Sequence, residues 1–272
     1  MTRYDFMAQR NGDSVRCFGK VRTIACTSGR QMVISPMTNA DIDMVARLYR
    51  DVWIHRGNYK DRLDPGARDN FERAGGMFRI QDERGLSKLV HDESEFVWVA
   101  KSEDGEALGT FWCGLNDPKY MESERIQPFP GYPDLSGHVQ HAFAERTLYF
   151  SREILVSPAC RGTALAETLF YTAMCNFYSR GYTMTCGEVY RVNAIRDAHG
   201  EHKVDMYNNA SHNMLLRTGA RCEGAFAPIQ IQADGFIATI SMQIMVWELA
   251  SALEKTREAL RLAGVYTWEE QV

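Results

Sequence analysis

The sequence has little that would mark a membrane, secreted or disulfide-bonded protein. Its longest apolar runs fall far short of the ~20 residues that a helix needs to cross a bilayer. The first residues, MTRYDFMAQRNGD, contain no apolar core of a signal peptide, so we expect a cytoplasmic protein. The seven cysteines are scattered and form no CxxC pair, which is typical of reduced thiols that pack as small core residues.

Metal-binding and polyanion-binding patterns are equally weak. His138 and His141 can share a helix face, but no third ligand accompanies them, and His199 and His202 stand in what reads as a loop. We therefore expect no metal site. The formal net charge is −4, so nothing in the overall charge favours nucleic acid or an anionic membrane as a partner.

What is present is the composition of an ordinary globular domain, with 45% hydrophobic and 24% charged residues in a chain of 272. No repeat or low-complexity linker divides the chain. The sequence predicts one main domain at 31–250, an N-terminal extension at 1–30 and a C-terminal helix within 251–272. Two insertions are expected, a charged one at 54–92 and a long irregular one at 117–143.

Hydrophobic periodicity predicts a mixed α/β fold, with a sheet flanked by helices. Apolar residues recur at helical spacing early in the chain, after residue 164, in a short late segment and near the C-terminus. The predicted helices are 41–52, 165–177, part of 208–219 and 248–264. The predicted strands are a hairpin within 95–115, single strands at 147–156 and 182–190, and a terminal hairpin at 226–232 and 235–249.

One connection between a predicted strand and a predicted helix has the features of an anion-binding site. The stretch SPACRGTALAETL, residues 157–169, places Arg161 and Gly162 just before the helix that follows. The first amides of a helix have no partner within it, and with the helix dipole they suit an anion such as a pyrophosphate. Ala164 and Ala166 leave room for a close approach. The alternative is an ordinary connection whose small residues serve close packing.

The segment LVSPACRGTALAETL resembles the acyl-CoA-binding motif of the GNAT superfamily of N-acyltransferases. Arg161 takes the first position of that motif, Ala164 stands where Gly is usual, and Ala166 takes the last position. A second segment, 208–219, resembles the family's late helix, which an Asn opens and a Gly ends. The resemblance covers about residues 32–248.

The resemblance implies a centrally splayed sheet and an acyl-CoA, most often acetyl-CoA, as co-substrate. Pantetheine would bond the exposed backbone of the strand that ends at 156, and the pyrophosphate would bind the amides of 161–166. Residues at the start of the late helix would lie near the cysteamine end or the adenosyl side. The implied cofactor residues are Ile154, Leu155, Val156, Arg161, Gly162, Thr163, Ala164, Ala166, Asn208 and Ser211.

Acyl transfer to an amine needs a proton acceptor, and a carboxylate on the splayed strands can serve. Glu153 and Glu188 are the candidates. The alternative for Glu153 is a solvated strand face or an ion pair with Arg152, and the alternative for Glu188 is an ion pair with Arg191. Many relatives carry a Tyr as general acid at the position that Leu215 occupies here. Tyr207, Tyr190 or no side chain then fills that role.

The expected function is transfer of an acyl group, most often acetyl, from CoA to a primary amine of a small molecule or amino acid in a ternary complex. A long-chain N-acyl amino acid synthase-like transferase is an alternative, favoured by the acidic stretch 52–72. A catalytically silent CoA-binding domain is another, favoured by Leu215 and Ala164. Terminal hairpins in this superfamily often pair subunits, which makes a homodimer possible.

Overall fold

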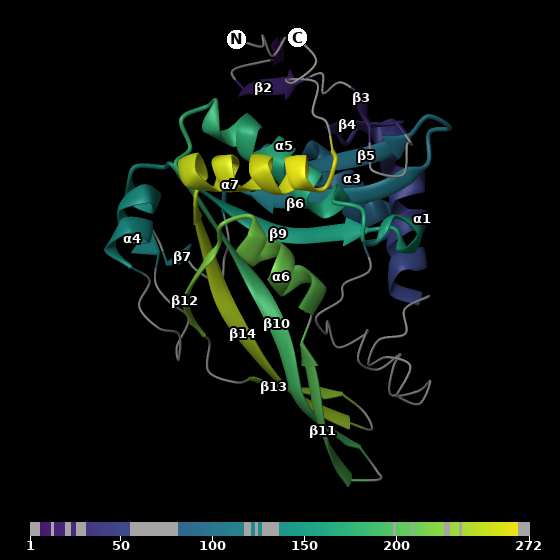
Figure 1. Ribbon diagram of the computed structural model, residues 1–272, viewed down its shortest axis with the longest axis vertical. Helices are drawn as coiled ribbons and strands as arrows, with labels where there is room; N and C mark the ends of the chain where they lie inside the picture. The colour runs from purple at the N-terminus through teal and green to yellow at the C-terminus, as the bar shows by residue number, and fades with distance from the viewer. Residues whose placement is uncertain are drawn as a thin grey trace.

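The computed structural model describes residues 6–11, 14–19, 23–25, 31–54, 81–116, 121–122, 125–126, 136–197, 200–207, 209–225, 229–233 and 236–265. A ten-stranded sheet lies at the centre of these residues, in the order β12-β14-β10-β9-β6-β5-β4-β3, with β11 beside β10 and β13 beside β14 (Figure 1). The strands are β3 (Thr23–Ala25), β4 (Gln31–Pro36), β5 (Glu95–Ser102), β6 (Ala107–Gly114), β9 (Leu148–Val156), β10 (Met184–Asp197), β11 (Gly200–Tyr207), β12 (Arg221–Ala225), β13 (Ile229–Ala233) and β14 (Phe236–Glu248). Among the described strands, β9 and β10 form the one parallel pair.

Helices cover both faces of the sheet, as the mixed α/β prediction requires. The helices α5 (Leu165–Tyr178) and α7 (Leu249–Leu262) pack on one face, and α1 (Ile42–Ile54) and α3 (Glu83–His91) on the other. We call the second face the α1 face. Alternate residues of a strand point to opposite faces, so β5 contributes Trp98 and Ala100 to the α5 side and Val97 and Val99 to the α1 face.

The core on the α5 side is built around Phe177, which lies near the C-terminus of α5. The ring of Phe177 stacks on Tyr149 of β9 with centroids 3.8 Å apart and meets Trp98 edge-on at 5.8 Å. Leu165, Leu169, Phe170, Ala173 and Phe177, the residues whose spacing predicted this helix, are all buried. The predicted helix at 165–177 is therefore confirmed.

The predicted N-terminal extension and the predicted insertion at 117–143 both contain regular structure. In the stretch 1–30, β1 (Phe6–Asn11) and β2 (Ser14–Gly19) form a hairpin, while β3 pairs with β4 and so belongs to the main sheet. The stretch 117–143, expected to be irregular, contains the short pair β7 (Met121–Glu122) and β8 (Arg125–Ile126) and most of α4 (Gly137–Ala144).

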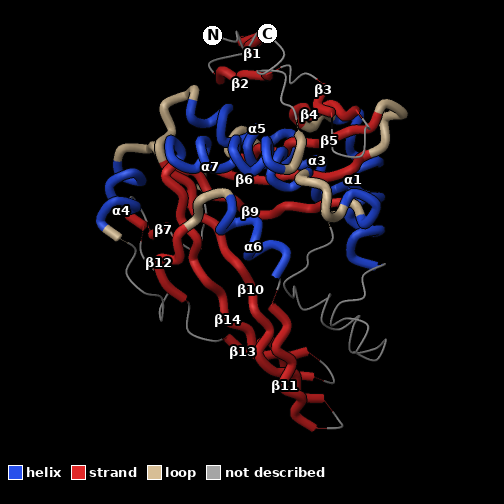
Figure 2. The backbone as a smooth tube through the Cα atoms, in the orientation of Figure 1, coloured by secondary structure: helices blue, strands red, loops and turns tan. Residues whose placement is uncertain are grey.

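The strand predicted at 182–190 is longer than its apolar pattern suggests. It runs to Asp197 and turns into β11, where Ile195 lies opposite His202, so the loop interpretation of the 199–202 stretch is wrong for His202. β11 is rich in charged residues and has no apolar run, so its cross-strand pairing, rather than its own pattern, makes it a strand. With β13 and β14 these strands extend away from the helical layers (Figure 2).

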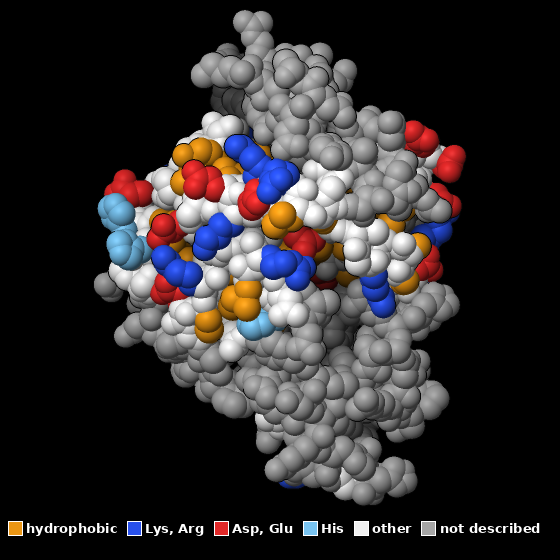
Figure 3. Space-filling view, viewed as in Figure 1, with side chains coloured by type: hydrophobic (Ala, Val, Ile, Leu, Met, Phe, Trp, Pro, Cys, Tyr) orange, Lys and Arg blue, Asp and Glu red, His pale blue; other side chains and the backbone are white. Residues whose placement is uncertain are grey.

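Acidic and basic side chains are interspersed over the helices on the face seen in Figure 3. On α7, for example, Arg261 pairs with Glu258 at 2.7 Å. Among the described residues, no helix is both long enough and apolar enough to cross a membrane. No group of three or more His, Cys, Asp or Glu in the same residues is arranged to hold a metal ion.

Candidate functional site

The sheet opens between β9 and β10. These strands pair in parallel only from Leu148 opposite Met184 to Ser151 opposite Gly187. Beyond that rung, residues 153–156 of β9 pair with β6 alone, while β10 continues beside β14. The predicted splay between the strands at 147–156 and 182–190 is thus present in the described residues.

Local sequence explains where the strands separate. Gly187 brings the two backbones close at the last rung, since a Cβ there would lie 2.8 Å from the carbonyl oxygen of Ser151. The Ser151 hydroxyl also bonds the hydroxyl of Thr185 at 2.9 Å. The next residue, Arg152, is the extra residue of a β-bulge against β6. A bulge bends its strand and increases the local twist, so β9 turns away from β10 immediately after Ser151.

The end of β9 presents backbone groups to this opening. The Ser157 amide donates to the carbonyl of Leu108, which is on the β6 side, at 2.8 Å. Backbone groups alternate in direction along a strand, so those of Leu155 also face β6 and those of Ile154 and Val156 face the opening. An extended ligand entering there finds donors and acceptors that have no ladder partner in the described residues.

The N-terminus of α5 follows this strand at once. A 3₁₀ turn over Pro158–Cys160 leads to Arg161, which is exposed, and to Gly162 at φ +75°. A Cβ on Gly162 would have nothing within 4 Å, so a ligand can approach its backbone. Thr163 turns inward instead, where its hydroxyl donates to the Cys160 carbonyl at 2.5 Å.

The helix itself begins without a capping side chain, because its N-cap residue is Ala164. The first backbone bond of the helix runs from the Thr168 amide to the Ala164 carbonyl at 2.9 Å. Within the described residues, the amides of Leu165 and Ala166 therefore have no backbone acceptor. Glu167, which would repel an anion here, is buried and paired with Arg217 of α6 (Asn209–Arg217). The result is a cluster of amide donors beside a cation.

Glu153 lies on the α1 face just past the separation point. Tyr49 of α1, itself buried, donates its hydroxyl to Glu153 Oε1 in a short hydrogen bond. Thr110 of β6 is the second hydrogen-bond partner of the Tyr49 hydroxyl. Burial raises the pKa of the Glu153 carboxyl to about 7, and the bond from Tyr49 lowers it less than burial raises it. A carboxyl with a pKa near 7 is suited to accept a proton at neutral pH.

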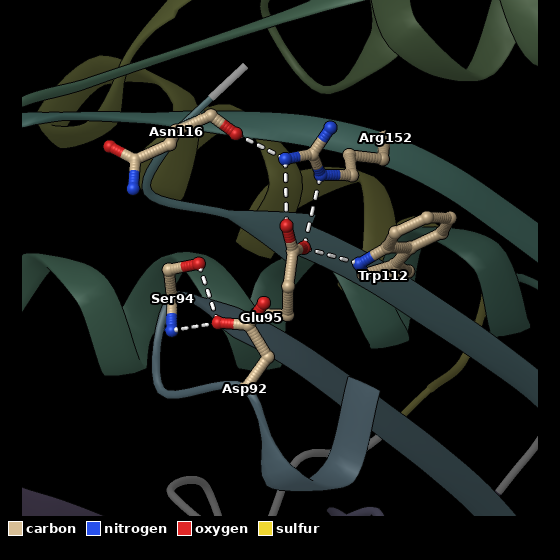
Figure 4. Close-up of polar contacts among 6 residues, drawn as sticks. All are labelled: Asp92, Ser94, Glu95, Trp112, Asn116 and Arg152. Atoms are coloured by element: carbon tan, nitrogen blue, oxygen red, sulfur yellow. Dashed lines mark hydrogen bonds and ion pairs between the residues drawn. The ribbon is translucent and has the colours of Figure 1, made fainter. Parts of the chain in front are cut away.

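The ion pair between Arg152 and Glu153, which was the alternative to a catalytic role for Glu153, does not form. Arg152 pairs with Glu95 of β5, with Nη2 2.8 Å from Oε1 and Nε 3.1 Å from Oε2 (Figure 4). Tyr49 lies in the helix that the sequence predicted at 41–52. Its role at Glu153 was missed, because the two residues are 104 positions apart in the chain.

The remaining predicted residues are placed less fully. Glu188 follows the last β9–β10 rung on β10, is partly buried, and points to the face opposite the core residue Val189, which is the α1 face. Tyr207 ends β11 opposite Arg191, and Ser211 lies in the first turn of α6, but nothing is described of these two side chains. Asn208 lies outside the described residues. Leu215 is buried in the core on the α5 side, so it packs rather than lining the opening.

No protein-family profile and no curated protein matches the sequence. Solved structures do match. An N-acetyltransferase from Staphylococcus aureus Mu50 is 14% identical, over 80% of this chain and 98% of that chain, at a TM-score of 0.48. The paia N-acetyltransferase from Thermoplasma acidophilum, in complex with coenzyme A, is 10% identical over 80% and 98%, also at 0.48. A GNAT family acetyltransferase from Listeria monocytogenes 4b F2365 is 13% identical over 80% and 98%, at 0.43.

Proposed function

We propose that the protein transfers an acyl group, most often acetyl, from CoA to a primary amine of a small molecule or amino acid. The proposal rests on three features that lie together at the opening of the sheet. A parallel strand pair opens at Ser151, an uncapped helix N-terminus lies at one end of the opened strand, and Glu153 lies at the other. These elements supply an unpaired strand edge for an extended thioester, donors for its phosphates and an acceptor for a proton.

The residues present fit an acyl-CoA. The open space at Gly162 and the unpaired amides of Leu165 and Ala166 suit a pyrophosphate, with Arg161 as the neighbouring cation. The backbone groups of Ile154 and Val156 suit the amides of pantetheine, which they would bond like an added strand. When bound, the acyl-CoA supplies a thioester carbon for attack and a thiol as leaving group.

Glu153 acts on the acceptor. An amine attacks only when it is neutral, so its ammonium form must first lose a proton, and Glu153 is the group that takes it. Tyr49 keeps the carboxyl aimed by donating to Oε1. Glu188, on the same face of the neighbouring strand, is the second candidate for this role. Tyr207 remains the predicted donor of the proton that the departing thiol receives.

The test is release of the CoA thiol from acetyl-CoA in the presence of a panel of primary amines. Removing a general base typically lowers the rate 10²–10⁴-fold, so Glu153→Gln should lose about that much while Glu188→Gln loses less. Arg161→Glu should abolish thermal stabilisation by acetyl-CoA. Full activity in both glutamate variants would show that neither is the base. Stabilisation without thiol release from any amine would instead identify a silent CoA-binding domain.

The length of the acyl group is open to the same assay. Replacing acetyl-CoA with a series of longer acyl-CoAs tests the long-chain alternative, and faster thiol release with the longer chains would replace acetyl as the preferred group. The acidic stretch that favoured this alternative lies mostly outside the described residues.

A further inference from the structure

The last rung before the sheet opens carries a pair of hydroxyls that the proposed function does not use. Ser151 of β9 lies opposite Gly187 of β10, and its hydroxyl bonds that of Thr185 at 2.9 Å. A Cβ on Gly187 would lie 3.2 Å from the Cβ of Ser151, so the glycine leaves the serine uncovered by its partner on the rung. The Ser151 side chain is partly exposed at the point where the two strands separate.

Burial gives this hydroxyl pair a preferred direction. Thr185 is fully buried, whereas Ser151 is not. Thr185 also interacts with the buried hydroxyl of Tyr149, which lies opposite it on β9 and has no other hydrogen-bond partner in the part of the chain that the structure describes. A buried hydroxyl proton without an acceptor is costly. Protons directed from Tyr149 to Thr185 and from Thr185 to Ser151 give both buried groups an acceptor, and they leave the Ser151 proton for a group in the opening.

The length of the opened strand sets where the reacting end of an acyl-CoA would lie. The proposed phosphate site is at the amides of Leu165 and Ala166, which follow the end of β9. From Val156 back to Ser151 the strand spans roughly 16 Å, at about 3.3 Å for each residue. That span is comparable with an extended pantetheine arm, so the thioester is expected where β9 and β10 separate. Glu153 then lies on the α1 face of the thioester and Ser151 on its α5 side.

We propose that Ser151 is a further catalytic residue, whose hydroxyl donates to the carbonyl oxygen of the thioester, and that Thr185 is the positioning residue behind it. This role rests on the proposed function, since only an acyl-CoA brings a thioester to this point. The two sides of the opening then have separate tasks. Glu153 prepares the amine on the α1 face, and Ser151 polarises the carbonyl from the α5 side.

The Ser151 hydroxyl acts while negative charge is on the carbonyl oxygen. The neutral amine nitrogen adds to the thioester carbon, and the electron pair of the C=O π bond moves to the oxygen, which the Ser151 proton stabilises without being transferred. When the C–S bond breaks, that electron pair re-forms the carbonyl and the sulfur leaves with the bonding pair. The proton that the new amide nitrogen loses balances the proton that the sulfur gains, so Ser151 ends the reaction unchanged.

A second hydroxyl pair beside the same two strands provides a matched control. Thr183 donates its hydroxyl to that of Thr147 at 2.9 Å, and these residues immediately precede β10 and β9. The pair therefore has the same chemistry as Ser151 and Thr185 but lies at the closed end of the parallel ladder. Thr183 is exposed, so Thr183→Val removes this bond without burying an unpaired group.

The experiment uses acetyl-CoA labelled with ¹³C at its carbonyl carbon, bound to the full chain without an amine and observed by NMR. A hydrogen bond to the carbonyl oxygen draws electrons from the carbon, so the bound signal of the wild type should lie downfield of free acetyl-CoA. The displacement should shrink in Ser151→Ala and in Thr185→Val and should persist in Thr183→Val. With an amine present, kcat for thiol release should fall roughly 10²-fold in Ser151→Ala with the KM for acetyl-CoA unchanged.

A bound carbonyl signal at the wild-type position in Ser151→Ala would overturn the role of Ser151, and so would a wild-type kcat. A raised KM with an unchanged kcat would also overturn it, because that pattern marks binding alone. Should Ser151→Ala fail to fold, Thr185→Val decides by the same carbonyl signal, since it preserves the shape of the buried residue. Failure of the proposed function is a separate result. A wild type that binds no acetyl-CoA rejects both proposals, whereas one that binds it and releases no thiol with any amine rejects only the transferase activity, and the carbonyl signal still decides whether Ser151 contacts the thioester.

Discussion

The partly buried Glu153 carboxyl should make the stability of the protein fall as pH rises from about 4.5 to about 7. Burial raises its pKa from an ordinary 4.5 to about 7 in the folded chain. Below pH 4.5 the carboxyl is protonated in both the folded and the unfolded state. Between 4.5 and about 7 the unfolded chain loses the proton and the folded chain keeps it, so the unfolded state is favoured progressively. Above about 7 both states are ionised and this effect is complete.

The size of the effect follows from the two pKa values. At about 1.36 kcal/mol for each pH unit, the difference between them corresponds to roughly 3 kcal/mol. The perturbation is Glu153→Gln, which has a similar shape, keeps an oxygen for the Tyr49 hydroxyl and does not titrate. The free energy of unfolding of the wild type, taken relative to this variant, should therefore fall by roughly 3 kcal/mol across the window.

Urea unfolding of both proteins, at pH values below, within and above this window, measures the difference directly. Tyr49→Phe is the matched second variant, because it removes the donor that lowers the pKa of Glu153. In that variant the pKa should rise further, and the loss of stability should continue to higher pH than in the wild type. A difference between wild type and Glu153→Gln that stays constant across the window would refute the buried, protonated carboxyl.

Three other changes test the framework of the site. Phe177→Ala should destabilise the fold by about 3–5 kcal/mol in urea unfolding, since its ring is fully buried against Tyr149; a loss below about 1 kcal/mol would contradict this packing. Gly162→Ala should cost roughly 1–2 kcal/mol in the same assay, because φ is +75° there although the space is open; a neutral result would mean that the turn relaxes. Gly187→Ala should cost about 1–3 kcal/mol and weaken thermal stabilisation by acetyl-CoA, because its Cβ would meet the Ser151 carbonyl at 2.8 Å. If acetyl-CoA stabilises Gly187→Ala as strongly as the wild type, the Ser151–Gly187 rung does not contribute to binding acetyl-CoA.

The hydrogen-bond and ion-pair partners around Glu153 could not be predicted from the sequence. Glu153 was selected as a candidate base from its place on a strand, and the alternative was a solvated strand face or an ion pair with the preceding residue, Arg152. The structure pairs Arg152 with Glu95, 57 positions away, and pairs Glu153 with Tyr49, 104 positions away. Neither contact leaves a signal in a local pattern, because each depends on the register between strands and on how a helix lies across them.

The sequence by itself determined the helices and strands in which apolar residues recur at regular spacing, because that spacing shows that one side of the element is buried. The helix at α5, the β5–β6 hairpin and the turn that precedes Ala164 follow from local periodicity and from residues with restricted backbone choices. Tertiary structure decided the rest. The pairing of β11 with β10, the opening of the sheet at Ser151 and the raised pKa of Glu153 all arise from strand register and burial. Those are properties of residues brought together from distant parts of the chain, and a pattern along the chain does not contain them.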